Sequence, residues 1–392
     1  MTPLYVDRVA KALENTKAAF KGSDSARKKD LQFLDRALDK LDTLPSAALE
    51  TVIAAFAEKN EEDRVGARPT AEQDSMPLIV QWKERWADHR EAREWAADVL
   101  ADVITCAVDG SQIFPSRDMS VPVGLVQVGW FINPHRADER YIKDVDVQVL
   151  TPDELAKSFE AGTADQEVSW RRFAGEVGRL QAFMEAYRGQ KALAFLDGSL
   201  ILSFVGSMWE ERQNQYINLI EGLLACSEET RVPVVGFIDS SHATDLTTLL
   251  QVIGSPVSGR TGDAALLQRR MEWGDRLRLF VCDRRDEVIR PDYYRNVLFT
   301  YLKTTRDRPP ARIEMPAWVF QAGQHDWVLD AVRAECIIGL GYPYALETAD
   351  AVAVLTMQDR ERFYRLFQQF ATDLGIHVRF SRKAQSKRAR RV

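Results

Sequence analysis

The chain has 392 residues, of which 45% are hydrophobic and 28% charged, a composition typical of a soluble globular protein. The formal net charge of -6 excludes a protein that is basic throughout, so any affinity for nucleic acid must come from local patches. The length exceeds what one small hydrophobic core needs, which predicts one large domain with helical additions or two closely packed domains.

Cysteine use and hydropathy indicate where such a protein would reside. The four cysteines, at positions 106, 226, 282 and 336, lie in or near apolar stretches without metal-like pairing, and we expect buried thiols. No segment approaches the roughly 20 apolar residues of a membrane span, and the first 20 residues lack an apolar core of signal-peptide type. These features favour a cytoplasmic protein that does not associate with a membrane.

The first 100 residues have the periodicity of amphipathic helices. Apolar residues recur at three- and four-residue spacing over residues 3–20 and 31–44, and Pro45 and Ser46 are residue types that begin a helix. A long helix is predicted from Pro77 to about Ala101, whereas the polar residues 60–75 predict a loop. We therefore expect an N-terminal helical region over residues 1–100.

The pattern changes after residue 101. Short apolar or alternating runs predict strands at 104–110, 124–132, 141–150, 192–202, 232–240 and 276–282. Helical patterns follow at 151–162, 166–189 and 207–229, and a final helix is predicted over 358–375. The sequence thus predicts an α/β fold, with a mixed sheet flanked by helices over residues 101–376, and a basic tail over residues 377–392.

The sequence Asp-Gly-Ser twice follows an apolar run, at Asp109 after ITCAV and at Asp197 after ALAFL. Such runs are typical of strands buried in an α/β sheet, where ligands gather at the carboxyl ends of strands. Carboxylates on neighbouring strands repel each other, and a divalent cation such as Mg²⁺ or Mn²⁺ would relieve the repulsion. Gly110 and Gly198 would let the backbone turn at the sheet edge. One Asp-Gly-Ser is an ordinary turn sequence, but two copies favour a site.

A set of motifs in fixed order resembles the NurA family of DNA-end-processing nucleases. The set comprises VDGS at 108–111, LDGSL at 196–200, ARIEMPAWV at 311–319, GYPYAL at 341–346 and AVAVL at 351–355, and the resemblance covers about residues 107–364. It implies an RNase H-like sheet, a Mn²⁺-dependent nuclease site with Mg²⁺ as the alternative metal, and DNA as the substrate. It also implies a homodimer, a HerA-type hexameric ATPase as partner, and a role in DNA repair by end resection.

The resemblance also implies which residues form the site. Asp109 and Asp197 match the two strand-borne metal ligands of the family. Glu176 matches a third ligand, because the family has an Arg-x-x-x-Glu pattern that begins here at Arg172. Arg172 and Glu176 also have the spacing of an ordinary surface ion pair, and Glu185 is the alternative ligand.

Tyr342 matches the tyrosine of the family's Gly-Tyr-Pro motif. The family has a histidine eight residues later, but this sequence has Asp350, which can bind a metal and, when ionised, cannot donate a proton. Asp350 can also be read as a polar residue at a helix end before a strand at 351–355. The implied catalytic set is Asp109, Glu176, Asp197, Tyr342 and Asp350, with Asp109, Glu176 and Asp197 as metal ligands.

The C-terminal tail has seven basic residues from Arg379 onward and no acidic residue. We expect the tail to add a sequence-independent, salt-sensitive contribution to DNA binding. The basic residues assigned to DNA are Arg382, Lys383, Lys387, Arg388, Arg390 and Arg391.

The leading interpretation is an enzyme, a Mn²⁺-dependent deoxyribonuclease that hydrolyses phosphodiester bonds, as an exonuclease or endonuclease, at DNA ends together with a HerA-type translocase. A catalytically weak subunit that guides DNA to a motor is a second interpretation, which Asp350 keeps open. An RNase H-like phosphotransferase or ATPase is a third. It would need a Gly-rich adenosine-binding motif, and only GLGY at 339–342 is present.

Overall fold

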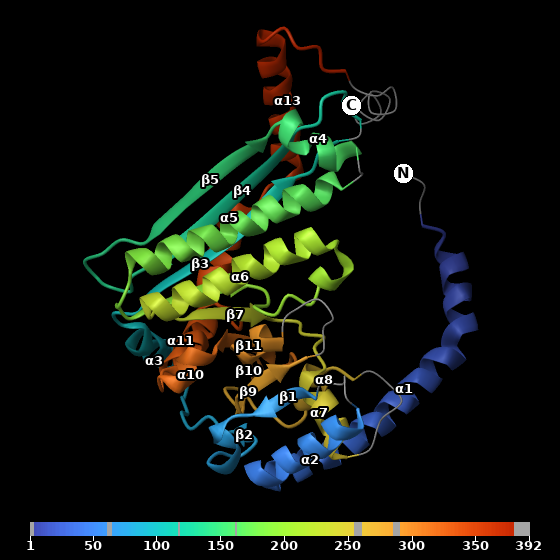
Figure 1. The fold of residues 1–392 in the computed structure, drawn as a ribbon, viewed down its shortest axis with the longest axis vertical. Coiled ribbons are helices and arrows are strands. Elements are labelled where there is room, and N and C mark those ends of the chain that lie inside the picture. Colours follow the sequence, from blue (N-terminus) through green and yellow to red (C-terminus); the bar gives the residue numbers. More distant parts are fainter. Residues whose placement is uncertain are drawn as a thin grey trace. The chain divides into compact units, whose positions relative to one another are not determined.

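A computed structural model describes residues 4–60, 65–116, 118–160, 163–254, 261–284 and 291–379. The chain divides into two compact units (Figure 1). Unit 1 comprises residues 1–84 and 238–317, and unit 2 comprises residues 85–237 and 318–392. Within the described ranges, no helix is both long enough and apolar enough to cross a membrane.

Unit 2 is built on a mixed sheet in which the strands lie in the order β5-β4-β3-β6-β7. Antiparallel pairing joins β3, β4 and β5, while β6 runs parallel to β3 and β7 runs parallel to β6. This is the RNase H-like arrangement, so the predicted fold class is confirmed. The strands are β3 (Ile104–Ile113), β4 (Gly124–Asn133), β5 (Ile142–Leu150), β6 (Ala192–Asp197) and β7 (Val234–Ile238).

The burial of these strands follows from their sequences. The apolar runs at the start of β3 and over most of β6 are buried, as expected for strands covered on both faces. In contrast, β5 alternates Val with Asp, Lys and Gln, and eight of its nine residues are exposed. Its composition therefore suits its place at the edge of the sheet.

Helices cover both faces of the unit 2 sheet. A Cβ atom on Gly175 of α5 would lie 2.8 Å from Val128, whereas a Cβ atom on Gly129 would lie 2.8 Å from Ala353 of α12. Because Val128 and Gly129 are consecutive in β4, α5 and α12 cover opposite faces. The helices are α3 (His89–Leu100), α4 (Pro152–Glu160), α5 (Ala164–Ala186), η2 (Val205–Ser207), α6 (Glu210–Thr230), α10 (Ala317–Gln321), α11 (His325–Ile338), α12 (Tyr344–Ala353) and α13 (Met357–Asp373).

Three sequence predictions in and near unit 2 are wrong in detail. The helix predicted from Pro77 begins only at His89, because the Asp88 carboxylate caps it by accepting from Arg90 N at 2.8 Å and Glu91 N at 3.1 Å. The strand predicted at 351–355 is absent, since residues 351–353 form the last turn of α12 against β4. β3 continues past Asp109 and Gly110 to Ile113 and pairs with β4 from Thr105 to Ile113.

Unit 1 combines long N-terminal helices with short strands. The two helices predicted before residue 45 form one continuous helix, and part of the predicted loop at 60–75 forms a strand and a 3-10 turn. β1 and β2 pair with β9 and β8, which lie some 200 residues later in the chain. The elements are α1 (Val6–Thr43), α2 (Ser46–Lys59), β1 (Gly66–Pro69), η1 (Ala71–Asp74), β2 (Ile79–Val80), α7 (Asp245–Ile253), α8 (Asp263–Leu267), β8 (Arg276–Leu277), β9 (Phe280–Asp283), α9 (Pro291–Arg295), β10 (Val297–Leu302) and β11 (Ala311–Pro316).

A buried ion network joins β11 to α7 within unit 1. Arg312, which is 2% exposed, donates from Nε to Glu314 Oε1 at 2.6 Å, and its Nη1 lies 2.7 Å from Asp245 Oδ2. Asp245 also accepts from Arg284 Nη2 at 2.6 Å. Each buried charge thus has an opposite partner, which is the condition for burying it without a large desolvation penalty.

Candidate active site

Asp109 and Asp197 lie side by side on neighbouring strands of unit 2. The parallel register of β3 and β6 sets Ala107 opposite Phe195 and Val108 opposite Leu196, so the next residue on each strand is an aspartate. Neighbouring strands are about 4.8 Å apart, which brings the two aspartates close together. Asp109 is partly buried, whereas Asp197 is exposed at the end of β6.

The register also determines which face of the sheet these aspartates occupy. Asp109 pairs with Gly129, whose α-carbon faces α12, so the side chain of Asp109 points to the face that α12 covers. Asp197 shares this face because it is in line with Asp109. Asp197 is also opposite Phe237, whose ring makes a T-shaped contact of 5.3 Å with Tyr342.

The α12 face thus gathers four of the five predicted catalytic residues. Asp350 is exposed on α12, and its charge acts on Asp109. Burial, with the negative charges of Asp350 and Asp197, raises the pKa of Asp109 to about 6, despite opposing contributions from the Gly110 amide and Arg172. The arrangement is a cluster of carboxylates that repel one another, at the carboxyl end of β6 and beside it on β3.

Glu176 approaches the cluster from the other face, over Gly110. It is 5% exposed on α5 and accepts a hydrogen bond from Arg172 Nη1, one helical turn earlier. Arg172 Nη1 also lies 3.5 Å from the carbonyl oxygen of Gly110. Burial raises the pKa of Glu176 to about 7; Arg172 opposes this shift, and Asp109 and Asp197 add to it.

The two glycines of the Asp-Gly-Ser motifs have different roles. Gly198 has φ +135°, a conformation that side chains disfavour, and it ends β6 as expected. Gly110 makes no turn, because it lies within β3. A Cβ atom there would come within 2.5 Å of Glu176 Oε1, so Gly110 provides space for Glu176 rather than flexibility.

The carboxylates offer only oxygen ligands, which suits a hard divalent cation such as Mg²⁺ or Mn²⁺. Among the described residues, however, no group of three or more His, Cys, Asp or Glu side chains is arranged to hold a metal ion. The site geometry gives a physical reason: Asp109 and Asp197 lie on one face, while Glu176 lies on the other and is held by Arg172. The donor chemistry fits the metal. Glu176 can be a third ligand only if its carboxylate leaves Arg172 and binds the cation instead.

Residues outside the five-residue set differ in their placement. Glu185, the alternative to Glu176, is about half exposed and bonded to Arg188 Nη2 at 2.6 Å, so its carboxylate already has a cationic partner at the surface. The six basic tail residues assigned to DNA lie outside the described residues, so their role stays a prediction.

Glu335, which none of the motifs indicated, is a buried carboxylate that anchors the start of α12. It accepts hydrogen bonds from Ala345 N and Thr105 Oγ1, both at 2.9 Å, and His135 Nε2 lies 3.8 Å away. Because α12 carries Asp350, Glu335 helps to set where that carboxylate lies. The available signal was a lone glutamate within the otherwise apolar end of a helix, AECII at 334–338.

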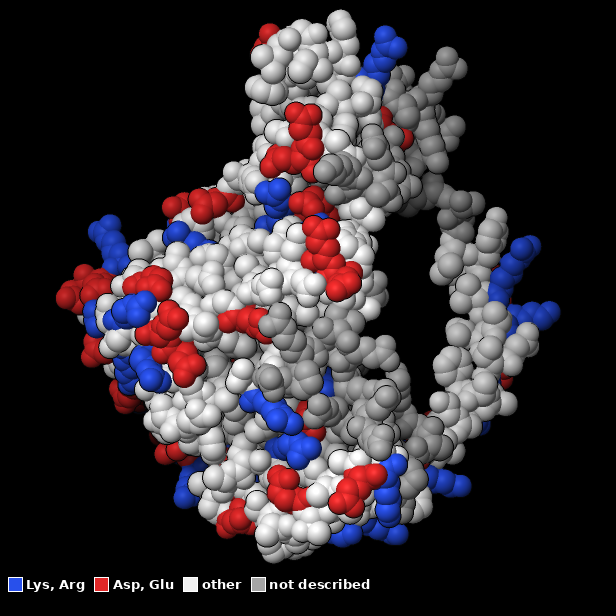
Figure 2. Space-filling view, viewed as in Figure 1, with Lys and Arg blue, Asp and Glu red and all other residues white. Residues whose placement is uncertain are grey.

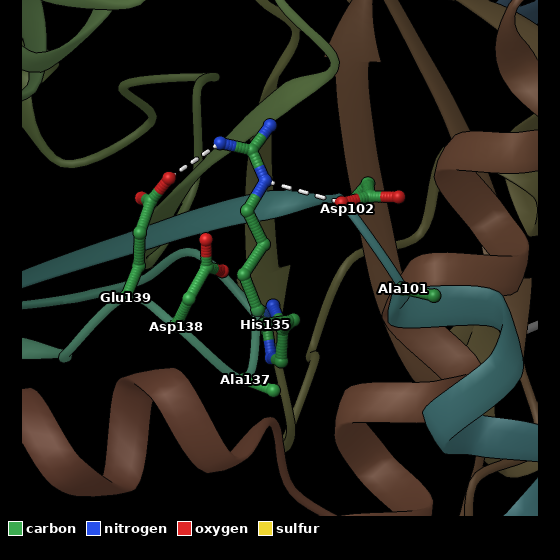
Figure 3. A pocket seen from close by; sticks show the side chains of 7 residues that line it. Ala101, Asp102, His135, Ala137, Asp138 and Glu139 are labelled. Carbon is green, nitrogen blue, oxygen red and sulfur yellow. Dashed lines mark hydrogen bonds and ion pairs between the residues drawn. The ribbon is translucent and has the colours of Figure 1, made fainter.

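A separate pocket of about 500 Å³ lies at the turn between α3 and β3, lined there by Asp102 and on the loop after β4 by His135 and Glu139 (Figure 3). Arg136 joins its two sides, donating to Asp102 Oδ1 at 3.1 Å and to Glu139 Oε1 at 2.7 Å. None of the five predicted catalytic residues is among its described lining residues.

The strand order of the sheet and the paired aspartates on its central strands β3 and β6 define an α/β protein of the RNase H-like class. The NurA domain family matches residues 103–355, about two thirds of the chain, and the chain belongs to this family. This confirms the family suggested by the motifs.

Solved structures similar to this chain include other NurA proteins. The NurA nuclease from Sulfolobus solfataricus is 16% identical, with 69% of this chain and 84% of that chain covered and a TM-score of 0.45. A structure of NurA with manganese is 11% identical, with coverages of 68% and 89% and a TM-score of 0.41. Endonuclease V from Bacillus subtilis is 12% identical, with coverages of 67% and 82% and a TM-score of 0.32. No curated protein sequence matches the chain.

Proposed function

We propose that this protein is a metal-dependent deoxyribonuclease that processes DNA ends, working with a HerA-type hexameric translocase. Membership of the NurA domain family supports the class of reaction. The observation that carries the proposal is the pairing of Asp109 and Asp197 on adjacent parallel strands, with Asp350 on the same face. Such clustered carboxylates are costly to hold together unless a cation neutralises them.

Asp109 and Asp197 would hold the cation from the α12 face, and Glu176 would complete the set. Mn²⁺ suits these ligands best in our proposal, with Mg²⁺ as the alternative. When bound, the metal supplies Lewis-acid activation of water and neutralises charge on the leaving oxygen. Tyr342 stands on the same face, held by its contact with Phe237, and would position the substrate or the attacking water.

Arg172 has a role of its own in this proposal. Its guanidinium keeps the buried Glu176 paired while no cation is present, and thereby limits the rise in the pKa of Glu176. A guanidinium that is displaced from Glu176 remains close to Gly110, where it can contact a phosphate of the substrate.

One observation favours a second candidate function, that of a catalytically weak subunit guiding DNA to a motor. Asp350 stands where the family motif has histidine. In that case the protein would bind DNA and the translocase but would cleave DNA slowly with any metal.

Incubation of the purified protein with end-labelled duplexes carrying blunt ends or overhangs, in Mn²⁺, Mg²⁺ or EDTA and with or without ATP, tests the proposal. We expect cleavage that requires a divalent cation and does not require ATP. Absence of cleavage in every metal, with DNA binding intact, would support the guiding subunit instead. ATP consumption by the protein alone would indicate the phosphotransferase class.

Assembly is tested separately from catalysis. We expect light scattering to give the mass of a homodimer, and the mass to rise when a HerA-type hexamer is added. A monomer at micromolar concentration that shows no mass increase with the hexamer would contradict this part of the proposal.

A further inference from the structure

An aromatic cluster lies beside Glu176 and plays no part in the proposed chemistry. The buried ring of Tyr216 on α6 is its centre, with ring centroids of three other residues 5.0–5.3 Å away. A fifth aromatic residue, Trp209, precedes the first turn of α6 and is linked to the others through the Arg212 guanidinium, which lies 5.4 Å from the Trp209 ring and 5.5 Å from the Trp170 ring. The aromatic cluster comprises Trp170, Phe173, Phe204, Trp209 and Tyr216.

The aromatic cluster is adjacent to the carboxylates through two elements of the fold. Trp170 and Phe173 precede Glu176 at three-residue spacing on α5, which places all three on one side of that helix. Phe204 lies in the segment that follows Asp197, only seven residues after it. Figure 1 shows α5 and α6, which carry most of the cluster, running side by side.

Charge coupling places the centre of the cluster close to the site as well. Burial raises the pKa of Tyr216, and the charges of Arg172 and Glu176 also act on its hydroxyl. These are the two residues that meet over Gly110 at the edge of the carboxylate cluster.

Two members of the aromatic cluster are open to solvent although their neighbours are packed. Phe204 is 50% exposed and Trp209 is 42% exposed, whereas Tyr216, which Phe204 contacts, is 3% exposed. The segment that carries Phe204 is fixed by Leu200, Leu202 and Val205, each fully buried. Exposed rings on a fixed support can stack on another flat ring without a large cost in ordering.

A cation also lies within the cluster. The Arg212 guanidinium is 5.5 Å from the Trp170 ring and 5.4 Å from the Trp209 ring, and its Nη2 donates to Glu167. The Arg212 side chain is 6% exposed, and its Nε and Nη1 have no hydrogen-bond partner within the described part of the chain. Arg212 therefore contacts both tryptophan rings from a buried position, and its charge is paired with Glu167.

We propose that Phe204 and Trp209 form a stacking site for the nucleobase of an unpaired nucleotide at the DNA end. The inference rests on the proposed nuclease function and adds to it a binding subsite for one unpaired base. Every base has a face that stacks on an aromatic ring, so the site would be indifferent to sequence. A base held here would place its backbone beside Arg172 and Glu176, which meet over Gly110.

The charge beside this site is acidic, because the exposed Glu210 and Glu211 directly follow Trp209, so the proposed attraction comes from stacking and not from charge. On the face in Figure 2, Lys and Arg side chains are interspersed with Asp and Glu. With a net charge of -6, a base-stacking site gives the protein affinity for DNA ends that phosphate contacts alone would not supply.

The test is binding in EDTA, where metal-dependent cleavage cannot occur. Fluorescence anisotropy would compare a duplex with a thymine overhang and the same duplex with an abasic overhang, which has the same phosphates. We expect wild type to prefer the overhang with bases by roughly 5- to 150-fold, the range for one stacked base. Phe204→Ala and Trp209→Ala should each remove most of this preference.

Two controls separate stacking from folding. Phe370→Ala removes a 60%-exposed ring on α13 and should leave the preference unchanged. Phe204→Trp should restore the preference, because the substituted ring can still stack. In addition, 2-aminopurine in the overhang should be quenched on binding to wild type and not on binding to Phe204→Ala, with circular dichroism confirming equal helix content.

Equal affinity of wild type for the two overhangs would overturn the inference, as would retention of the preference by both alanine variants. These outcomes are distinct from failure of the proposed function. Cleavage in Mn²⁺ without a preference for bases would contradict only the proposed stacking site. A base preference without cleavage would contradict only the proposed nuclease function.

Discussion

Gly110 leaves the space that Glu176 occupies, since a Cβ atom at position 110 would lie 2.5 Å from Glu176 Oε1 and 2.6 Å from Arg172 Cγ. Asp109 and Gly110 of β3 therefore contribute to the site on opposite faces of the sheet. Asp109 points toward α12, and the missing side chain of the next residue admits a carboxylate from α5. Because position 110 has no side chain, Glu176 on the α5 face can come close to Asp109 on the α12 face.

Gly110→Ala should lower DNA cleavage by roughly 10- to 100-fold, the loss typical when a catalytic group moves by about 1 Å. The methyl group would displace Glu176 and Arg172 while the strand remains paired. Gly178→Ala is the matched control, because this α5 glycine has no atom within 4 Å of the added Cβ. Gly178→Ala should retain activity and melt at an equal or higher temperature. Equal activity of the two variants would show that Glu176 does not need its present position.

Asp350→Ala should raise the Mn²⁺ concentration needed for half-maximal cleavage, because it removes a negative charge that acts on Asp109. Asp350→His should retain activity but lose it below about pH 6.5, where a protonated imidazole cannot bind metal. Metal titrations at pH 6 and 8 measure both effects. Wild-type behaviour of both variants at every pH and metal concentration would place position 350 outside the site.

The buried Glu335 gives the folding stability a predictable pH dependence. Burial raises the pKa of Glu335 to about 7, despite its bonds to Ala345 N and Thr105 Oγ1, while an unfolded glutamate titrates near 4.5. The folded state thus binds this proton more tightly, so its contribution to stability is largest below pH 4.5 and is lost as the pH rises to about 7.

Glu335→Gln should therefore gain stability relative to wild type as the pH rises from 5 to 8, by about 2 to 3 kcal/mol. The glutamine also loses an acceptor at the α12 amides, but that cost is similar at both pH values and cancels in the comparison. Urea unfolding at the two pH values measures the change. A constant difference between the two proteins would mean that Glu335 titrates normally.

Removal of residues 381–392 should weaken DNA binding and flatten its salt dependence. The deletion removes six basic residues and no acidic one. For each phosphate that the shortened protein no longer binds, the slope of log affinity against log salt should fall by about 0.9 for duplex DNA. Binding isotherms at several salt concentrations measure the slope, and an unchanged slope would show that the tail does not contact DNA.

Much of the unit 2 fold was predictable because each of its strands has a residue pattern that can be recognised within a short stretch of sequence. The apolar runs before Asp109 and Asp197 predicted buried strands, and these strands are adjacent and parallel as the carboxylate argument required. The motifs also predicted the NurA family, which the family match confirms.

Other features depended on contacts between distant residues and left no local signal. The pleat assigns Asp109 and Glu176 to opposite faces, which only the register with β4 and α5 reveals. The strand β2 occurs within a stretch with helical periodicity because it pairs with β8, about 200 residues away. β11 contains the buried Arg312, whose charge is balanced by Glu314 on the same strand and by Asp245, which lies far earlier in the chain and which no short sequence window brings beside it.

The central claim is that Asp109 and Asp197 together hold the divalent cation used for DNA cleavage. The most direct measurement is Mn²⁺ binding by electron paramagnetic resonance on wild type, Asp109→Asn and Asp197→Asn, with DNA cleavage followed in the same samples. Glu185→Gln, which alters an exposed carboxylate outside the cluster, is the control. We predict that both asparagine variants keep the fold, lose most bound Mn²⁺ and lose cleavage together, while Glu185→Gln matches wild type. A folded Asp109→Asn or Asp197→Asn protein that binds Mn²⁺ and cleaves DNA like wild type would contradict the account.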